Sequence, residues 1–172
     1  VSEQADIAGA RAVFLEAAGA ALAALDAMRC AEGAHIARDF EKRLARLEDQ
    51  RMQVREIAPA IVAEYRTHLM DVLAEFRTVT PDETRIVQEA ALYADRVNIT
   101  EELVRLASHF AQFRAILAEE EPVGRRLDFL LQEINRETNT IGSKVNNAAA
   151  QQIVVAMKNE VEKLREQVQN LE

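Results

Sequence analysis

The sequence predicts an all-α protein of elongated, long antiparallel helices, and three observations support this fold class. Ala, Leu, Glu, Arg and Gln dominate the 172 residues, whereas there are five Gly, three Pro and no Trp. Residues of the first group have high helix propensity, and Gly and Pro interrupt helices. Apolar residues recur at intervals of three and four along most of the chain, and no strand-like alternation is found.

A first long helix is predicted from about Glu3 through at least Met28. Its apolar face consists of Ile7, Ala10, Phe14, Ala17, Ala21 and Met28, widened by Leu22 and Leu25. The same period continues past Gly33 to Ile57, so the helix is expected to extend that far. Gly33 costs about 1 kcal/mol of helix stability relative to Ala, which suggests a bend or a close contact at this point.

Proline residues mark the expected starts of the next two helices. Pro59 suits the first turn of a helix that ends near Phe76, because proline lacks the backbone N–H that a first turn leaves unpaired. Thr80 can cap a further helix and Pro81 can occupy its first position. These helices complete a long-helix region, residues 1–97, expected to serve as an arm or in oligomerisation.

The C-terminal region, residues 98–172, is expected to contain three helices. Asn98 or Thr100 caps the first of them. Its apolar face is formed by Leu103, Leu106, Phe110, Phe113 and Leu117. The second runs from about Val123 to Thr140, where Gly142 is expected to break it. The last covers about Ala148 to Gln169. Strict three-four spacing makes its apolar face a coiled-coil-like seam of Val154, Met157, Val161, Leu164, Val168 and Leu171.

Composition excludes several classes of protein. A formal net charge of −8 argues against a general nucleic-acid coat protein, although a local basic strip or a divalent metal lets an acidic protein bind RNA. Cys30 is the only cysteine, which excludes a disulfide framework and a thiolate metal cluster. Arg11, Glu16 and Asp26 interrupt the apolar run of residues 8–27, so it predicts no membrane span, and no basic segment precedes it, so no signal peptide is expected either. A soluble cytoplasmic protein is expected.

The segment Gly124–Lys144, GRRLDFLLQEINRETNTIGSK, is the most informative part of the chain. Read as a helix, it has an apolar arc formed by Leu127, Leu130, Leu131, Ile134 and Ile141. Its polar arc contains Arg125, Asp128, Gln132, Asn135, Arg136 and Asn139. Such side chains bind phosphate, metal ions or one another in fixed geometry. Phe129 lies within the polar arc, where it could stack on a base or anchor a subunit interface.

Glu133 and Glu137 lie between the two arcs, one helical turn apart. Like charges at this spacing destabilise a helix mildly unless Arg126, Arg136 or a cation lies between them. Clustered carboxylate oxygens are what a hard divalent ion requires. The spacing leaves a metal site and a structural salt-bridge network as equal alternatives.

A second group of candidates lies at the start of the preceding helix. Glu102, Arg105 and His109 share one face, so His109 could act as a general acid or base or bind metal, and Arg105 could hold a phosphate. The plainer interpretation is an ion pair beside an incidental histidine. Glu101 and Glu102 could simply complement the helix dipole.

Basic residues at helix ends are further candidates for phosphate binding. Arg125 and Arg126 follow Gly124, and Lys144 follows Gly142. These positions also fit ordinary helix boundaries. The Gly142 segment lacks the rest of a phosphate-binding loop, so no nucleotide cofactor is predicted.

The segments GRRLDFLLQEINRETNTIGSK and NITEELVRLASH resemble the C-terminal part of the YicC/YloC family of bacterial proteins, which are metal-dependent endoribonucleases. Proteins of this family are longer and begin with an α/β domain that is not found here. The chain, which opens at Val1, is therefore expected to be the helical C-terminal portion. The resemblance also favours a functional His109, because RLASH matches a family motif. Asn98 and Asn147 stand where the family pattern has Asp, and each removes a possible carboxylate ligand.

The resemblance implies an endoribonuclease that uses Mg2+ or Mn2+ to hydrolyse RNA phosphodiester bonds. The implied catalytic residues are His109, Glu102, Glu133 and Glu137. The implied metal ligands are drawn from Glu101, Glu102, Asp128, Glu133 and Glu137. The implied RNA-binding residues are Arg105, Arg125, Arg126, Gln132, Arg136, Asn139 and Lys144. A ring-like homo-oligomer, a hexamer, is also implied.

The alternative is a helical oligomerisation module without catalysis. In that case the polar face of residues 124–144 is a buried network between subunits, which specifies assembly as polar groups in helix seams can.

Overall fold

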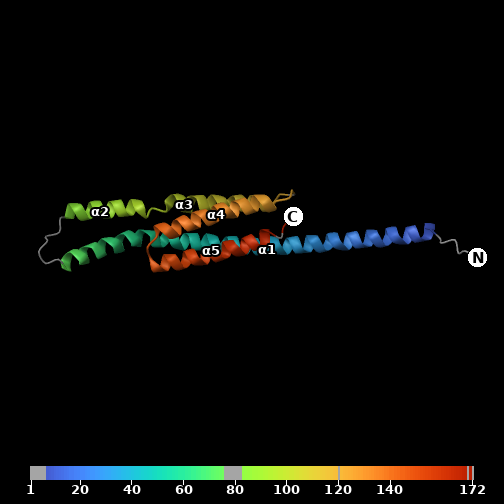
Figure 1. Cartoon of the computed structure of the whole chain (residues 1–172), viewed down its shortest axis with the longest axis horizontal. Coiled ribbons are helices and arrows are strands. Elements are labelled where there is room, and N and C mark those ends of the chain that lie inside the picture. Colours follow the sequence, from blue (N-terminus) through green and yellow to red (C-terminus); the bar gives the residue numbers. More distant parts are fainter. Residues whose placement is uncertain (1–6, 76–82, 120, 170, 172) are drawn as a thin grey trace, which may run out of the picture. The chain divides into compact units, whose positions relative to one another are not determined.

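A computed structural model describes residues 7–75, 83–119, 121–169 and 171 of the chain (Figure 1). These described residues form five α-helices: α1 Ile7–Glu75, α2 Glu83–Arg96, α3 Thr100–Leu117, α4 Gly124–Lys144 and α5 Ala148–Val168. The described residues contain no strand, so the all-α prediction is confirmed. None of these helices combines the length and apolar character needed to cross a membrane.

The chain divides into two compact units after Asp39, and α1 contributes residues to both. The first unit contains the part of α1 that precedes Phe40. Much of its predicted apolar face is exposed, including Phe14, Leu22, Leu25 and Met28. A Cβ atom built on Gly33 would meet no other described residue within 4 Å, so close packing among these residues does not explain this glycine.

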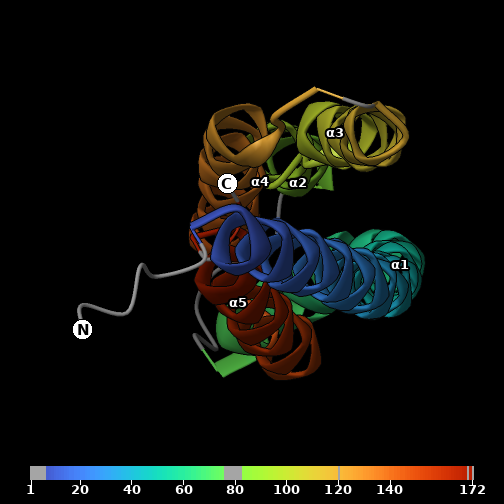
Figure 2. The ribbon, with the colours of Figure 1, turned by 90° about the vertical axis from the view of Figure 1, so that its right-hand side faces the viewer.

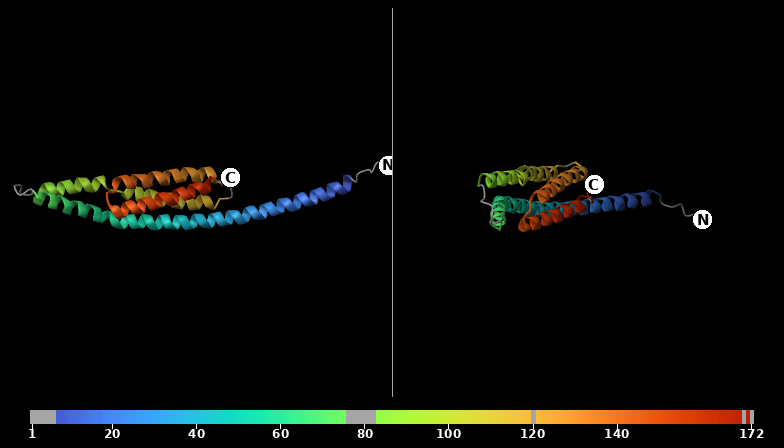
Figure 3. Two further views of the ribbon diagram at one scale, coloured as in Figure 1. Left: turned by 60° about the horizontal axis from the view of Figure 1, so that its bottom comes forward. Right: turned by 60° about the vertical axis from the view of Figure 1, so that its left-hand side comes forward.

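The helix predicted to start at Pro59 is a misreading, because Pro59 lies inside α1. Figure 3 shows the green, C-terminal part of α1 continuing as an unbroken helical ribbon. Proline in a helix interior removes one backbone hydrogen bond, but Val54 and Ile61 are buried on either side and favour continued helix. The predicted Thr80-Pro81 start lies outside the described residues.

Pro59→Ala is expected to stabilise the protein, because alanine restores the missing backbone hydrogen bond at an exposed position. The free energy of unfolding should rise by about 1–3 kcal/mol. Urea denaturation followed by circular dichroism measures the change. A lower stability than wild type would instead show that the proline is needed for the path of α1.

The second unit, from Phe40 onward, contains the hydrophobic core. In this unit α4 packs against both α3 and α5, as the end-on view of Figure 2 shows. The largest fully buried side chains are Phe40, Leu44, Leu47, Leu106, Phe110, Phe113, Leu127, Leu131, Ile134, Ile141, Met157 and Leu164. Phe40 of α1 and Phe113 of α3 meet edge to face, with their ring centroids 5.6 Å apart. The core therefore holds α3, α4 and α5 on the second half of α1.

The predicted break at Gly142 is wrong, since α4 continues to Lys144. A Cβ atom at Gly142 would lie 3.0 Å from Cγ1 of Val154, so glycine allows α4 and α5 to approach closely here. The coiled-coil-like seam of α5 is buried at Val154, Met157, Val161, Leu164 and Val168.

Asn98 and Asn147 both support helix starts. The Asn98 side chain accepts a hydrogen bond from the backbone N–H of Thr100 at 3.0 Å, one residue before the N-cap position of α3, which is Ile99. Asn147 is the N-cap of α5 and accepts from the N–H of Ala150 at 3.1 Å. Its amide also donates to Glu64 at 3.0 Å, which an aspartate could not do.

Glu160 on α5 is a buried carboxylate held between cations of two helices. Arg43 of α1 lies 3.0 Å from one of its oxygens and Lys163 lies 3.1 Å from the other. Burial raises the pKa of Glu160, but the hydrogen bonds and charges of Lys163 and Arg43 outweigh burial and set this pKa below its usual 4.5. The carboxylate thus stabilises the fold above pH 4.5, and this stabilisation is lost as the pH falls through the lowered pKa.

Glu160→Gln is expected to lower the free energy of unfolding by about 1–2 kcal/mol at pH 7, because charge-assisted contacts are lost, although the half-exposed Lys163 contributes less than the largely buried Arg43. The difference from wild type should shrink as the pH falls from 4.5 through the lowered pKa, where the carboxyl of the folded wild type becomes protonated. Urea denaturation at several pH values measures this. A difference that stays constant across the acid range would rule out the ionic origin.

Candidate metal site between α3 and α4

A row of polar side chains lies along the interface between α3 and α4. Glu102 contacts Lys144, with 2.7 Å between carboxylate oxygen and Nζ. One turn further along α3, Arg105 contacts Glu137, with 3.3 Å between Nη1 and Oε1. As residue numbers rise along α3 they fall along α4, so the two helices are antiparallel.

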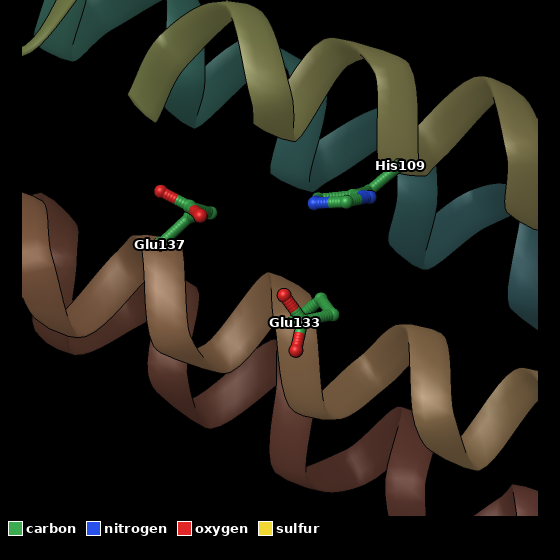
Figure 4. A group of neighbouring side chains, drawn as sticks. All are labelled: His109, Glu133 and Glu137. Atoms are coloured by element: carbon green, nitrogen blue, oxygen red, sulfur yellow. The ribbon is translucent and has the colours of Figure 1, made fainter. Parts of the chain in front are cut away.

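One further turn along α3, His109 lies close to Glu133 and Glu137 of α4. We call these three residues the His–Glu–Glu group. Each residue offers one ligand atom, and these three atoms lie within 4.8 Å of one another. Figure 4 shows the imidazole of α3 and the two carboxylates of α4 pointing toward one another. Glu137 is buried, and the other two residues are partly buried. Three groups capable of binding a cation thus converge at one point.

Buried apolar residues fix the positions of these side chains. On α3, Leu106 and Phe110 flank His109 in sequence and are fully buried. On α4, Ile134 is fully buried between the two glutamates. Glu133 and Glu137 are one helical turn apart on α4. Packing of the apolar face of α4 against α3 therefore directs both carboxylates toward α3.

One ring nitrogen of His109 has unused bonding capacity. Its Nδ1 atom is buried and has no hydrogen-bond partner among the described residues. Buried polar atoms are normally paired, because leaving one unpaired costs about 1–3 kcal/mol. A bound ion, a water molecule or a ring rotation would each supply the missing interaction.

The two carboxylates of the group are unequally neutralised. Arg105 bridges Glu137 and Glu101, and its hydrogen bond to Glu137, followed by the charge of Glu101, raises the pKa of Arg105. Glu133 has an ion pair with Arg136 at 3.7 Å, but that arginine side chain is 72% exposed. Ion pairs of this exposed kind contribute little. The site therefore retains negative charge around an imidazole.

These residues fit a hard or intermediate divalent cation. Carboxylate oxygens suit Mg2+ and Mn2+, and an imidazole nitrogen suits transition metals. Three protein donors would leave coordination positions for water or a substrate oxygen, as Mg2+ usually requires. Of the predicted salt-bridge network through Arg126 and Arg136, the Arg136–Glu133 pair is observed, whereas Arg126 pairs with Glu119 at 2.9 Å.

The other predicted metal ligands lie outside the His–Glu–Glu group. The Glu101 side chain is 70% exposed and pairs with Arg105. Glu102 is buried against Lys144, and its Oε2 atom has no hydrogen-bond partner among the described residues. Asp128 accepts from Gln132 at 2.8 Å and lies 3.7 Å from Arg165.

The predicted RNA-binding residues are spread over the surface of α4 and its ends. Those classed as exposed are Arg125, Arg126, Gln132, Arg136 and Asn139. Lys144 is partly buried, because its Nζ also donates to the backbone oxygen of Asn98 at 2.9 Å. Phe129 is 64% exposed, so its predicted role in stacking or in an interface stays a prediction.

A cavity of about 640 Å³ lies beside Arg105. It is lined by Asp95, Asn98, Thr100, Glu101, Val104, Arg105 and Lys144. Sequence reasoning missed Asp95, Thr100 and Val104 as members of a site. The available signal was that these residues lie close to the predicted junction of two helices, α2 and α3. Spacing within one helix does not show which residues of another helix lie nearby.

Comparison with known proteins identifies the family to which this chain is similar. The sequence family described as "Endoribonuclease YicC-like, C-terminal" matches residues 54–172. A protein of Clostridioides difficile (strain 630) named "Probable endoribonuclease YicC" is 41% identical over 154 residues, which cover 88% of this chain and 53% of the relative. The identically named protein of Haemophilus influenzae (strain ATCC 51907 / DSM 11121 / KW20 / Rd) is 38% identical over 146 residues, covering 85% of this chain and 50% of the relative.

The chain thus spans about half the length of these curated relatives. The family match includes every residue of α3, α4 and α5, and with them the whole polar row. Family membership predicted from the two sequence motifs is therefore confirmed. The chain belongs to the YicC-like endoribonuclease family and contains its C-terminal region.

Proposed function

We propose that this chain is the helical part of a metal-dependent endoribonuclease, and that the His–Glu–Glu group holds its divalent cation. The observation that carries the proposal is the convergence of three ligand atoms within 4.8 Å, beside a buried imidazole nitrogen that has no hydrogen-bond partner in the described part of the chain. The names of the relatives, "Probable endoribonuclease YicC", support RNA as the substrate. Mn2+ and Mg2+ are the proposed ions because the donors are two carboxylates and one imidazole.

A bound divalent ion would supply Lewis-acid polarisation of the phosphate and neutralise its charge. Glu133 and Glu137 would hold the ion, and the buried flanks of α3 and α4 keep their carboxylates in place. His109 is proposed to bind the ion or to carry a proton at its second ring nitrogen. Arg105 and Lys144, at the adjoining cavity, are proposed to hold the RNA backbone.

The test is cleavage of an end-labelled hairpin RNA by this chain, with Mn2+ and with excess EDTA. The full-length relative from C. difficile serves as a positive control for the assay. The proposal predicts cuts that require Mn2+ and disappear in Glu133→Gln. Metal-independent cutting, or equal cutting by wild type and Glu133→Gln, would contradict it.

Activity can also require parts of a longer protein, so metal binding is tested separately. Mn2+ binding to the chain, followed by the electron paramagnetic resonance signal of free Mn2+, should saturate at one site and weaken in Glu133→Gln. Absence of such a site would overturn the metal assignment whatever the cleavage result.

A second role is favoured by the first unit of the chain, and we propose that it mediates association between copies of this protein. Phe14, Leu22 and Met28 are each more than half exposed on one helix, and contiguous exposed apolar patches commonly mark interaction sites. The family resemblance suggests six copies. Light scattering of wild type and Leu22→Asp tests this proposal, which predicts an assembly in wild type and a smaller mass in the variant. Equal masses would contradict it.

A further inference from the structure

Arg105 lies between the His–Glu–Glu group and a neighbouring cavity, and its side chain contacts both. On one side its Nη1 atom lies 3.3 Å from Oε1 of Glu137, a member of the His–Glu–Glu group. On the other side it lines the 640 Å³ cavity, whose polar lining includes Thr100, Lys144 and the two carboxylates Asp95 and Glu101. The same guanidinium therefore touches the proposed metal site and the proposed RNA site.

The two carboxylates that contact Arg105 differ in burial. The Glu137 side chain is 4% exposed, whereas the side chain of Glu101, the second partner of Arg105, is 70% exposed. The Arg105 side chain itself is half exposed. A buried carboxylate needs a countercharge more than an exposed one does, because burial removes the water that would solvate it. Glu137 therefore depends on the charge of Arg105 more than Glu101 does when no other cation is near.

A divalent cation at the His–Glu–Glu group would change this balance. It would neutralise Glu137 more strongly than one guanidinium does, and it would repel the positive charge of Arg105. Arg105 would then be released toward the cavity, where the Nζ of Lys144 and the hydroxyl of Thr100 could also meet an anion. Guanidinium groups bind phosphate oxygens in a bidentate manner, which makes a backbone phosphate a fitting ligand.

We propose that Arg105 is exchanged between Glu137 and an RNA backbone phosphate in this cavity, so that metal binding and RNA binding strengthen each other. This inference rests on the proposed function. It assigns the cavity as a phosphate subsite beside the metal site, and Arg105 as the residue that couples them. By linkage, RNA must raise the affinity for Mn2+ by the same factor as Mn2+ raises the affinity for RNA.

For the variant Arg105→Gln, the exchange predicts a higher affinity for Mn2+ and a lower affinity for RNA. Removal of a cation that competes for Glu137 should tighten Mn2+ binding in the absence of RNA by about threefold to tenfold. The same change should weaken binding of a 2′-O-methyl hairpin RNA in the presence of Mn2+ by about tenfold. The factor by which Mn2+ raises the affinity for RNA should then fall toward one. Couplings of about 5-fold to 150-fold are typical of linked sites, so both changes are measurable.

Arg114→Gln is the matched control. Arg114 lies on the same helix, carries the same charge and pairs with Glu41 at 3.2 Å, away from the His–Glu–Glu group. Mn2+ binding is measured by electron paramagnetic resonance and RNA binding by fluorescence anisotropy, at fixed ionic strength because both depend on salt. Arg105→Lys, which keeps the charge, should show a smaller gain in Mn2+ affinity. Circular dichroism checks that each variant is folded.

The outcomes separate the inference from the proposed function. If wild type binds Mn2+ and Glu133→Gln weakens this binding, but Arg105→Gln matches Arg114→Gln, the exchange is wrong and the metal site stands. Weaker Mn2+ binding by Arg105→Gln would also overturn the exchange, because Arg105 would then support the site. If wild type binds no Mn2+, the metal site fails and the exchange fails with it.

Discussion

Glu137→Gln is expected to lower the affinity for Mn2+ by more than about 100-fold and to abolish metal-dependent RNA cleavage. Glutamine keeps the shape of the side chain but removes the charge that attracts the ion. Loss of groups that only support a metal ligand commonly costs 10-fold to 100-fold in affinity, so loss of a ligand itself should cost at least as much. Glu137 is also the most buried member of the His–Glu–Glu group, where water compensates least for the lost charge.

The matched control for this prediction is Glu160→Gln. Glu160 is buried to a similar degree, with 7% exposure against 3% for Glu137, and it is also paired with cations. Its replacement should reduce stability but leave Mn2+ affinity unchanged. Titration calorimetry measures both variants. Equal losses of Mn2+ affinity in the two would attribute the effect to destabilised packing, and no loss in either would remove Glu137 from the site.

Phe113→Ala is expected to cause the largest loss of stability, about 3–5 kcal/mol in the free energy of unfolding. Phe113 is fully buried and packs edge to face on Phe40, so the substitution removes a large apolar contact and leaves a cavity. Edge-to-face pairs contribute about 0.5–1.5 kcal/mol beyond burial. This loss is a large share of the 5–15 kcal/mol that typically stabilises a domain. Urea denaturation of the two proteins measures it.

Phe129→Ala provides the comparison, because it removes the same ring from a position that is 64% exposed. Exposed substitutions usually change stability by less than about 0.5 kcal/mol. Measurements at low protein concentration limit any contribution from self-association. A loss below about 1 kcal/mol in Phe113→Ala would contradict the assignment of the α1–α3 contact to the core.

Apolar periodicity predicted the last three helices well, and it failed where a single residue was given too much weight. The faces predicted for α3 and α5 are buried almost residue for residue, because amphipathic spacing determines which side of a helix packs. Pro59 and Gly142 were interpreted as boundaries from their local preferences. Both lie inside helices, since burial of their neighbours outweighs the local cost of about 1–3 kcal/mol.

The candidate site could be predicted only in part for a similar reason. Spacing along one helix placed Glu133 and Glu137 together, and a family motif drew attention to His109. Which residues of α3 face which residues of α4 depends on the register of packing, and this register is not encoded in either helix alone. Sequence reasoning therefore grouped Asp128 with the carboxylates and placed Arg126 beside Arg136 in the salt-bridge network, whereas Arg105 of α3 is the residue that pairs with Glu137.

The most direct test of the metal assignment is a crystal structure of this chain grown with Mn2+, with diffraction data collected to reveal anomalous scattering from manganese. The proposal predicts one anomalous peak bounded by His109, Glu133 and Glu137, and its loss in crystals of Glu137→Gln. A strong peak at other residues, or no peak at this group in fully Mn2+-loaded crystals, would contradict the assignment.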